Sequence, residues 1–323
     1  MSEIGTLVSV IGGAGYTGAW LCRQLLAEGY RVRVFDNFMF GTEGLRGLDS
    51  PHLSVIEGSM CDIDAVCEAM KGADVVILLA GIVGHRLSDI RWTDQRNVNL
   101  FASSIVLDSA IEHGVTRFIF ASTSSVYGEQ SGLMYETSIP EPVSLYCRLK
   151  LRMEERVLSA QKRSFHPTVL RLANCHGYSP RMRFDLVANA LMRDAAINKA
   201  IAIPSGEQSR VLIHVEDAAR SFIACLKAHE NLVSGEVFNV GAPDQNIQLN
   251  QLANLVKSLV PETTINIEER ESESGGYRLS CSKIEKVLDF SPRWTLEASL
   301  SQLRDLLLAG HFPDPFSLRY HNS

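Results

Sequence analysis

The stretch that decides the fold is LVSVIGGAGYTG, residues 7–18, near the start of a chain of 323 residues. It opens with a short, mostly apolar run and continues with Gly12, Gly15 and Gly18. Glycines at this spacing allow a tight turn, close approach of the backbone to a pyrophosphate, and close packing of a helix. The amphipathic stretch 19–28 then predicts a helix whose first amides face the phosphates. The segment therefore predicts the strand, turn and helix that open a dinucleotide-binding fold.

The same alternation of apolar strands and helices continues through the first half of the chain. Further strands are predicted at 31–35, 53–57, 75–79, 118–121 and 168–172, and further helices at 63–71, 97–113 and 146–161. Parallel strands joined by helices form a sheet that is covered on both faces. The expected fold class is therefore α/β, a Rossmann doubly wound parallel sheet.

The regular alternation fades beyond about residue 174, where shorter and less regular segments follow. We expect residues 1–177 to form the dinucleotide-binding Rossmann domain, with segments of about 210–240 returning to it. Residues 178–323 are expected to form mainly a smaller C-terminal α/β lobe that binds the substrate.

Composition narrows the classes of function. The formal net charge is −6 and there is no basic run, which gives no support for binding nucleic acid or a membrane surface. No apolar run approaches the roughly 20 residues that a membrane-spanning helix needs, and the first residues lack the basic region of a signal peptide. Seven scattered cysteines without a Cys-x-x-Cys pair are typical of reduced thiols rather than of a zinc site. We therefore expect a cytoplasmic protein without a bound metal.

An acidic residue at the end of the second predicted strand indicates which dinucleotide is bound. Asp36 lies 18 residues after Gly18, where a carboxylate would hydrogen-bond the adenosine ribose. Residues 37–39 offer no arginine for a 2′-phosphate, so NAD is expected rather than NADP. Asp62, after the third strand, could hold the adenine amino group, although a solvated carboxylate is an equal alternative.

Tyr146 and Lys150 stand four residues apart on a predicted helix, which places both side chains on one face. A phenol with a pKa near 10 is a poor base at neutral pH, and a nearby ammonium favours the phenolate. The hydroxyl cluster 122–125 follows a strand, at the sheet edge where open α/β folds bind ligands. These groups together predict proton transfer to or from a substrate hydroxyl.

The motifs, taken in this order, resemble the extended short-chain dehydrogenase/reductase superfamily, in its NAD-dependent nucleotide-sugar epimerase/dehydratase family. The glycine loop is similar to the family's G-x-x-G-x-x-G, ASTSSVYG at 121–128 to its active-site strand, and residues 146–150 to its Y-x-x-x-K. The resemblance implies that Thr123 is the catalytic hydroxyl and Tyr146 the base. Lys150 would lower the tyrosine pKa and hold the nicotinamide ribose.

The resemblance also implies a set of cofactor-binding residues. Asn97-Val98 matches the family's N-V-x-G-T, except that Leu100-Phe101 replaces Gly-Thr, which predicts altered packing there. The expected NAD contacts are Gly12, Gly15, Tyr16, Thr17, Gly18, Asp36, Asn37, Asp62, Ile63, Ala80, Gly81, Asn97, Tyr146 and Lys150.

The second half carries the residues that the resemblance assigns to the substrate, a nucleotide-diphosphate sugar. Arg171-x-x-Asn174-x-x-Gly177 resembles R-x-x-N-x-x-G, and residues 210–217 resemble R-x-x-I-H-V-x-D, whose arginine binds the diphosphate. The residues expected to bind the substrate are Ser124, Asn174, Arg181, Arg183, Arg210, Arg270 and Tyr277. Residues 179–183 and 36–40 are similar to enzymes acting on GDP-linked heptoses. Cys175 and His176 could be further acid/base groups or could simply line or pack a loop.

The residues after Thr123 indicate the reaction. The family's 4,6-dehydratases carry a carboxylate there, whereas this chain has Ser124 and Ser125, as 4-epimerases do. We therefore expect C4 epimerisation through a transient 4-keto sugar. The alternatives are a C4 dehydrogenase, a 4,6-dehydratase and, in another class, a non-catalytic NAD(P)-sensing protein. The family also implies a homodimer, while the base, the sugar and the stereochemistry stay open.

Overall fold

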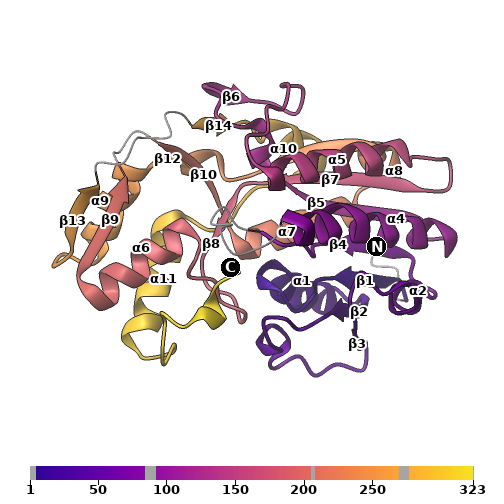
Figure 1. Ribbon diagram of the computed structural model, residues 1–323, viewed down its shortest axis with the longest axis horizontal. Coiled ribbons are helices and arrows are strands. Elements are labelled where there is room, and N and C mark those ends of the chain that lie inside the picture. Colours follow the sequence, from indigo (N-terminus) through magenta and orange to yellow (C-terminus); the bar gives the residue numbers. More distant parts are fainter. Residues whose placement is uncertain (1–4, 84–91, 205–207, 269–275, 323) are drawn as a thin grey trace.

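A parallel sheet of seven strands forms the centre of the computed structural model, which describes residues 5–83, 92–204, 208–268 and 276–322 (Figure 1). In the order in which they lie side by side, the strands are β11 (Glu236–Val240), β7 (His166–Leu172), β5 (Arg117–Thr123), β4 (Val75–Leu78), β1 (Leu7–Ile11), β2 (Arg31–Asp36) and β3 (Leu53–Glu57). All neighbouring strands run parallel. The predicted α/β class with a Rossmann sheet is confirmed.

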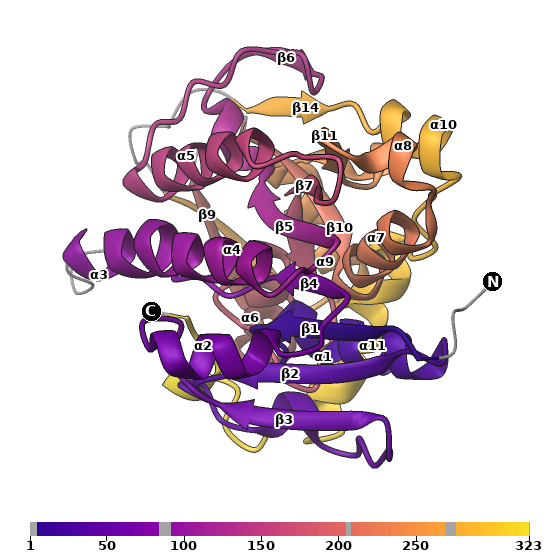
Figure 2. The ribbon, with the colours of Figure 1, turned by 90° about the vertical axis from the view of Figure 1, so that its right-hand side faces the viewer.

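Helices cover both faces of this sheet (Figures 1 and 2). Val8 and Val10 of β1 belong to a buried cluster with α1 and α7, whereas Leu7 and Ile11 belong to another with α2, α4 and α5. Alternate side chains of a strand point to opposite faces, so both faces of β1 need apolar residues. The bounds are α1 (Tyr16–Ala27), α2 (Ile63–Met70), α4 (Ser103–Glu112), α5 (Leu145–Ser159) and α7 (Val215–Lys227).

A smaller lobe lies beside the carboxyl edge of the sheet (Figure 1). Its core is a third buried cluster from α6 (Val187–Asn198), α9 (Leu249–Leu259) and α11 (Leu296–Leu308), closed by Phe312 and Tyr320 of the C-terminal tail. β9 (Ala200–Pro204) pairs with β13 (Thr264–Glu268) in this lobe, and β10 (Ser209–His214) pairs with β8 (Asn174–His176) and β12 (Asn246–Gln248). A further pair, β14 (Tyr277–Leu279) with β6 (Gly132–Met134), packs with the cluster of α1 and α7. The remaining helices are α3 (Trp92–Arg96), α8 (Glu230–Val233) and α10 (Ser282–Leu288).

Part of the second half returns to the central sheet. β11 pairs with β7 along its whole length, and α7 packs against α1 in the same buried cluster. Residues 215–240 therefore lie with the Rossmann sheet. The predicted boundary after residue 177 stays a prediction.

The helix predicted at 97–113 has a different form in the structure. A π-helical turn, Asn97–Ala102, joins α3 to α4. The wider turn leaves Asn97 exposed and buries Asn99, whose side-chain amide exchanges two 2.8 Å hydrogen bonds with the backbone of Ile82. A local hydrogen-bond pair thus outweighs regular helical spacing at this point.

Two absences hold for the described ranges. Every helix in them is too short or too polar to cross a membrane. Within the same ranges, no group of three or more His, Cys, Asp or Glu side chains is placed to hold a metal ion.

Candidate active site

The carboxyl ends of β1, β4 and β5 bring the predicted catalytic and cofactor residues to one edge of the sheet. β1 ends at Ile11, just before Gly12, β4 ends at Leu78, two residues before Ala80, and β5 ends at Thr123. Because these strands are parallel neighbours, their ends lie side by side. This edge is where open α/β sheets bind ligands.

The glycine loop is shaped so closely that side chains would not fit in it. Gly12 has φ +87°, and a Cβ atom there would lie 2.7 Å from the Ala80 nitrogen. A Cβ atom at Gly18 would lie 2.3 Å from the Gly12 oxygen. Gly15 precedes the first residue of α1, so the first amides of this helix face the loop. The loop is thus a cradle of the kind that holds a dinucleotide pyrophosphate.

Tyr16 and the start of α1 join the two lobes. The Tyr16 hydroxyl donates to the Gly177 oxygen at 2.6 Å and accepts from Nδ2 of Asn189 at 3.1 Å. The Ser179 hydroxyl donates to the backbone carbonyl oxygen of Tyr16 at 2.8 Å. The Tyr16 side chain, predicted to contact the cofactor, is therefore committed to the second lobe, and burial raises its pKa. Thr17 lies beside Cys175.

Asp36 closes the loop from the end of β2. Its Oδ2 accepts from the Ala14 amide and its Oδ1 from the Phe38 amide, both at 3.0 Å. Burial raises the pKa of Asp36, while these amides act in the opposite direction. Asp36 thus shapes the glycine loop, and its contact with an adenosine ribose stays a prediction.

Three other residues predicted to contact the cofactor have exposed side chains. Asp62 caps α2 by accepting from the Asp64 and Ala65 amides, at 3.1 and 3.2 Å. Asn37 accepts from the backbone of its own turn, and 58% of Ile63 is exposed. Their roles in binding NAD stay predictions.

The side chains of Lys150 and Tyr146 lie near each other, as the helical spacing predicts. The Lys150 ammonium is buried, donates to the Ala121 oxygen at 2.8 Å, and lies 6.0 Å from the centre of the Tyr146 ring. A Cβ atom at Gly81 would lie 3.6 Å from the Lys150 Nζ. The pair therefore stands between the end of β4 and the end of β5.

In the structure the pKa of Tyr146 is raised, and its lowering by Lys150 stays a prediction. Burial raises the pKa of Tyr146, and the positive charge of Arg183 only partly opposes this. Burial also lowers the pKa of Lys150 from 10.5 to about 8, with the Glu154 carboxylate acting against it. The physical reason is desolvation, which disfavours the charged form of both groups.

Hydroxyl groups surround the end of β5. Thr123 Oγ1 accepts from the Ser125 amide at 3.1 Å. Tyr277, which the sequence assigned to the substrate, donates from its hydroxyl to Ser124 Oγ at 2.8 Å. Burial raises the pKa of Tyr277 to about 12, against the effect of its hydrogen bonds to Ser124 and Ser125. The second half of the chain thus reaches the catalytic hydroxyl cluster.

Behind the catalytic pair lies a buried polar network that sequence reasoning missed. Arg171 Nη2 contacts Glu154 Oε2 at 2.8 Å, and Ser122 donates to the same carboxylate. Arg171 Nη1 donates to the Tyr127 hydroxyl at 2.9 Å, which donates to Asn239 at 2.8 Å. A buried carboxylate and guanidinium bonded on several sides hold the backbone around them in one arrangement.

The two arginines of the 179–183 segment point to different places. Arg183 Nε donates to Asp185 at 3.0 Å, and its charge reaches Tyr146 and Cys175. Arg181 is buried and stacks 4.3 Å from the centre of the Phe40 ring, in the loop after β2. Arg181, predicted to bind substrate, therefore faces the loop that follows Asp36.

The other residues assigned to the substrate lie on or beside the short strands β8 and β10. Asn174 donates from Nδ2 to the Val211 oxygen at 3.2 Å, and Arg210 donates to Gln208 Oε1 at 2.8 Å. Arg270 lies outside the described residues. Asn97 is exposed, as noted above, while its neighbour Asn99 makes the bonds to Ile82.

His176 packs the lobe instead of facing the catalytic pair. Its ring nitrogens bond Ser299 Oγ at 2.9 Å and Gln245 Oε1 at 2.8 Å, and burial lowers its pKa to about 4. The Cys175 side chain is half-buried, and its electrostatic influence extends to Tyr146; burial raises its pKa to about 11. Of the two open interpretations for His176, the structure favours packing.

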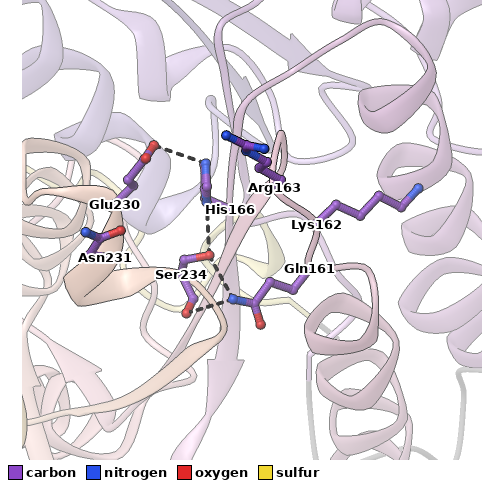
Figure 3. Close-up of a pocket in the computed structure, with 7 residues that line it drawn as sticks. All are labelled: Gln161, Lys162, Arg163, His166, Glu230, Asn231 and Ser234. Atoms are coloured by element: carbon purple, nitrogen blue, oxygen red, sulfur yellow. Dashed lines mark hydrogen bonds and ion pairs between the residues drawn. The ribbon is translucent and has the colours of Figure 1, made fainter.

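A pocket of about 630 Å³ lies at the other edge of the sheet, by the amino end of β7 (Figure 3). His166 bonds Ser234 Oγ and Glu230 there, both at 3.0 Å. The lining residues are Gln161, Lys162, Arg163, His166, Glu230, Asn231 and Ser234. This pocket is separate from the catalytic residues, which stand at the carboxyl edge.

A Rossmann sheet with a glycine loop and a Tyr–Lys pair at its carboxyl edge defines the class of nucleotide-dependent enzymes that move a hydride and a proton. The chain belongs to the NAD dependent epimerase/dehydratase family, whose model matches residues 8–241. This membership confirms the predicted family and NAD as the cofactor. The cradle at Gly12 and Gly18 and the carboxylate of Asp36 fit that dinucleotide.

Relatives of known sequence cover nearly the whole chain. A UDP-glucose epimerase of Bacillus subtilis, described as uncharacterized, is 28% identical over 309 residues, which are 91% of this chain and 95% of the relative. UDP-glucose 4-epimerase of Yersinia pestis is 27% identical over 324 residues, covering 92% and 94%. The structure of UDP-glucuronic acid 4-epimerase from Bacillus cereus, with UDP-glucuronic acid and NAD, is 26% identical. It covers 94% of this chain and 99% of that chain, with a TM-score of 0.85.

Proposed function

We propose that the protein is an NAD-dependent epimerase that inverts C4 of a nucleotide-diphosphate sugar, with UDP-glucuronic acid and UDP-glucose as the first candidates. The observation that carries the proposal is the buried Lys150 held 6.0 Å from the Tyr146 ring at the end of β5. The relatives named above act on UDP-sugars by their names, and the family supplies the dependence on NAD.

The residues divide the work by position. Tyr146 takes the proton of the sugar hydroxyl and later returns it. Lys150, which is held by its hydrogen bond to the Ala121 oxygen, orients the reactants. Thr123 and Ser124 hold the sugar oxygen at the end of β5. NAD, when bound, supplies the acceptor and donor of the C4 hydride. The keto-sugar turns between the two hydride steps, so that the configuration at C4 is inverted.

The environment of the carboxylates favours epimerisation over dehydration. A dehydratase needs a carboxylate or similar base to take a C5 proton, and Ser124 and Ser125 cannot provide one. Glu154, which lies on the helix of Tyr146, is bonded to Arg171 and Ser122. Its carboxylate is thus occupied behind Lys150. A C4 dehydrogenase uses the same trio and remains the second candidate within the family.

Substrate contacts follow from the positions at the carboxyl edge. We assign the sugar nucleotide to Ser124, Asn174, Arg183, Arg210 and Tyr277, with Arg270 retained from the sequence. Guanidinium groups suit phosphate oxygens because their planar fork donates to two of them. The GDP-heptose likeness of the 179–183 segment makes GDP-sugars part of any substrate screen.

We further propose a cytoplasmic homodimer. The seven cysteines are free, in keeping with a reducing compartment. Helices α4 and α5 would form the interface, although Val106 and Val157 are fully buried inside the subunit and cannot serve it. Light scattering on a sizing column tests the dimer, and a mass of one chain contradicts it.

A screen of UDP-, GDP-, ADP- and CDP-sugars with the purified protein tests the function. The expected result is a C4 epimer without net NADH. Stoichiometric NADH would replace epimerisation by net oxidation, and loss of water from the sugar would show a dehydratase. Turnover of no sugar nucleotide at all, by protein shown to bind NAD, would favour the sensing alternative.

A further inference from the structure

Arg181 is a buried cation whose hydrogen-bonding capacity is only partly used. Its side chain comes from the second lobe, and the residue is 3% exposed. Nη2 donates to the His321 oxygen at 3.3 Å. Nε and Nη1 are buried and have no hydrogen-bond partner among the residues that the structure describes. Buried donors left in this way cost free energy, which an acceptor on a bound ligand would recover.

The surroundings of Arg181 belong to the dinucleotide side of the site. Its guanidinium stacks 4.3 Å from the centre of the Phe40 ring, in the loop that follows Asp36. Asp36 in turn bonds the Ala14 amide of the glycine loop at 3.0 Å. Burial and the nearby charge of Arg183 lower the pKa of Arg181 to about 10. The negative charges of Asp185, Asp36 and Glu43, in this order of size, oppose that shift. Arg181 and Asp36 therefore face one region from opposite lobes.

The C-terminal tail holds Arg181 in this position. Arg319 pairs with Glu43 at 2.9 Å, which ties the tail to the loop after β2. The Phe184 amide donates to the Tyr320 oxygen at 2.9 Å, and His321 accepts from Arg181. The tail thus ends between the two lobes (Figure 1). The tail is thus bonded both to the loop after β2 and to the second lobe. Because these bonds hold the residues around Arg181 in place, its guanidinium is preorganised for a ligand.

We propose that Arg181 binds an oxygen atom of the adenosine half of NAD through Nε and Nη1, so that the second lobe and the C-terminal tail complete the cofactor site. The acceptor is a ribose hydroxyl or a pyrophosphate oxygen, both of which suit a guanidinium donor. This assignment moves Arg181 from the substrate, where the sequence placed it, to the cofactor. It rests on the NAD dependence of the family and not on the sugar or the net reaction.

Titration calorimetry of NAD against the purified protein tests the assignment. Arg181→Met keeps the apolar stem and removes the donors, and it should weaken NAD binding by about tenfold or more. Affinity for UDP, measured on the same protein as a probe of the substrate side, should change less than about twofold. NAD affinity within about twofold of wild type in folded Arg181→Met overturns the proposal. Weakened UDP binding with unchanged NAD binding returns Arg181 to the substrate.

Two further variants separate binding from folding. Arg193 is also a buried arginine of this lobe, stacked 4.5 Å from the Phe316 ring and bonded to Asp194 at 2.8 Å. Arg193→Met should leave NAD affinity unchanged. Arg181→Lys keeps the charge but not the planar fork, and should weaken NAD by several-fold. If Arg181→Met does not fold, unchanged NAD affinity in Arg181→Lys overturns the proposal.

The result is independent of the proposed function. NAD affinity is read without any turnover, so loss of binding in Arg181→Met supports the assignment even if no sugar nucleotide is epimerised. Conversely, if Arg181→Met binds NAD as tightly as an active wild-type epimerase does, the proposed C4 reaction is unaffected and the role of Arg181 in binding NAD is wrong.

Discussion

The Lys150 ammonium donates a hydrogen bond to the carbonyl oxygen of Ala121 at 2.8 Å, and so ties helix α5 to the strand that ends at Thr123. This one contact fixes the helix of Tyr146 against the strand that carries the catalytic hydroxyl. The three groups that the spacing of the sequence predicts as a unit therefore share a rigid frame. A frame of this kind limits the reorganisation needed during the reaction.

Replacing the base should abolish turnover and spare the cofactor. Tyr146→Phe removes only the hydroxyl that we assign as the proton acceptor, so we expect turnover to fall by at least about 100-fold. NAD affinity should stay within about threefold of wild type, since one hydroxyl is lost. Tyr135→Phe, at an exposed tyrosine, is the control and should behave as wild type. Wild-type turnover in Tyr146→Phe would remove the assignment.

A matched pair of glycine variants tests the cradle. Gly12 and Gly29 have nearly the same φ, +87° and +86°, but of the two only Gly12 faces another backbone, at Ala80. A Cβ atom at Gly29 would meet nothing within 4 Å. Both alanine variants share the strain of positive φ, so we expect Gly12→Ala alone to lose NAD binding. Equal NAD affinities of the two alanine variants by calorimetry would show that the close approach of Gly12 to Ala80 is unimportant for NAD binding.

The buried ion pair behind the site should be a stability element. Glu154→Gln leaves the Arg171 guanidinium buried without its counter-charge, and should lower the free energy of unfolding by about 3–5 kcal/mol. Glu155→Gln, on the same helix, breaks an exposed pair with Arg152 and should change it little. Denaturant unfolding compares the two. Similar small losses would show that the Glu154 pair contributes no more than a surface contact.

The burial of Lys150 predicts a specific pH dependence of stability. Its pKa falls from 10.5 to about 8 on folding, so the unfolded chain binds the extra proton between these pH values. Stability relative to Lys150→Met should therefore rise with pH across this window, by up to about 3 kcal/mol. Below pH 8 the cost of burying the ammonium is present in full. A difference that stays flat or falls from pH 8 to 10.5 contradicts the lowered pKa.

The parts of the candidate site whose placement could be predicted from the sequence depend on local spacing. Tyr146 and Lys150 are one helical turn apart, and the glycine loop is a continuous segment, so neighbouring residues determine both. The sheet was predictable for the same reason, because each strand and helix carries its own apolar pattern.

The parts that were missed depend on packing between distant segments. Tyr277 reaches Ser124, and Arg181 reaches Phe40, only through the folded arrangement of the second lobe. Asn99 rather than Asn97 is buried and bonds Ile82, in a π-helical turn that the sequence did not predict. The role of Asn97 in binding NAD stays a prediction. Glu154 could have been found, since it lies one further turn along the Tyr146–Lys150 face.

The proposed reaction oxidises and re-reduces C4 within one site. A UDP-glucuronic acid or UDP-glucose carrying deuterium at C4 tests it most directly, with the product followed by NMR. We predict that the C4 epimer forms and keeps its deuterium at C4, because the hydride that leaves the sugar is the one that returns. An epimer that has exchanged this deuterium with solvent, or deuterium released in net NADH, would contradict this proposal.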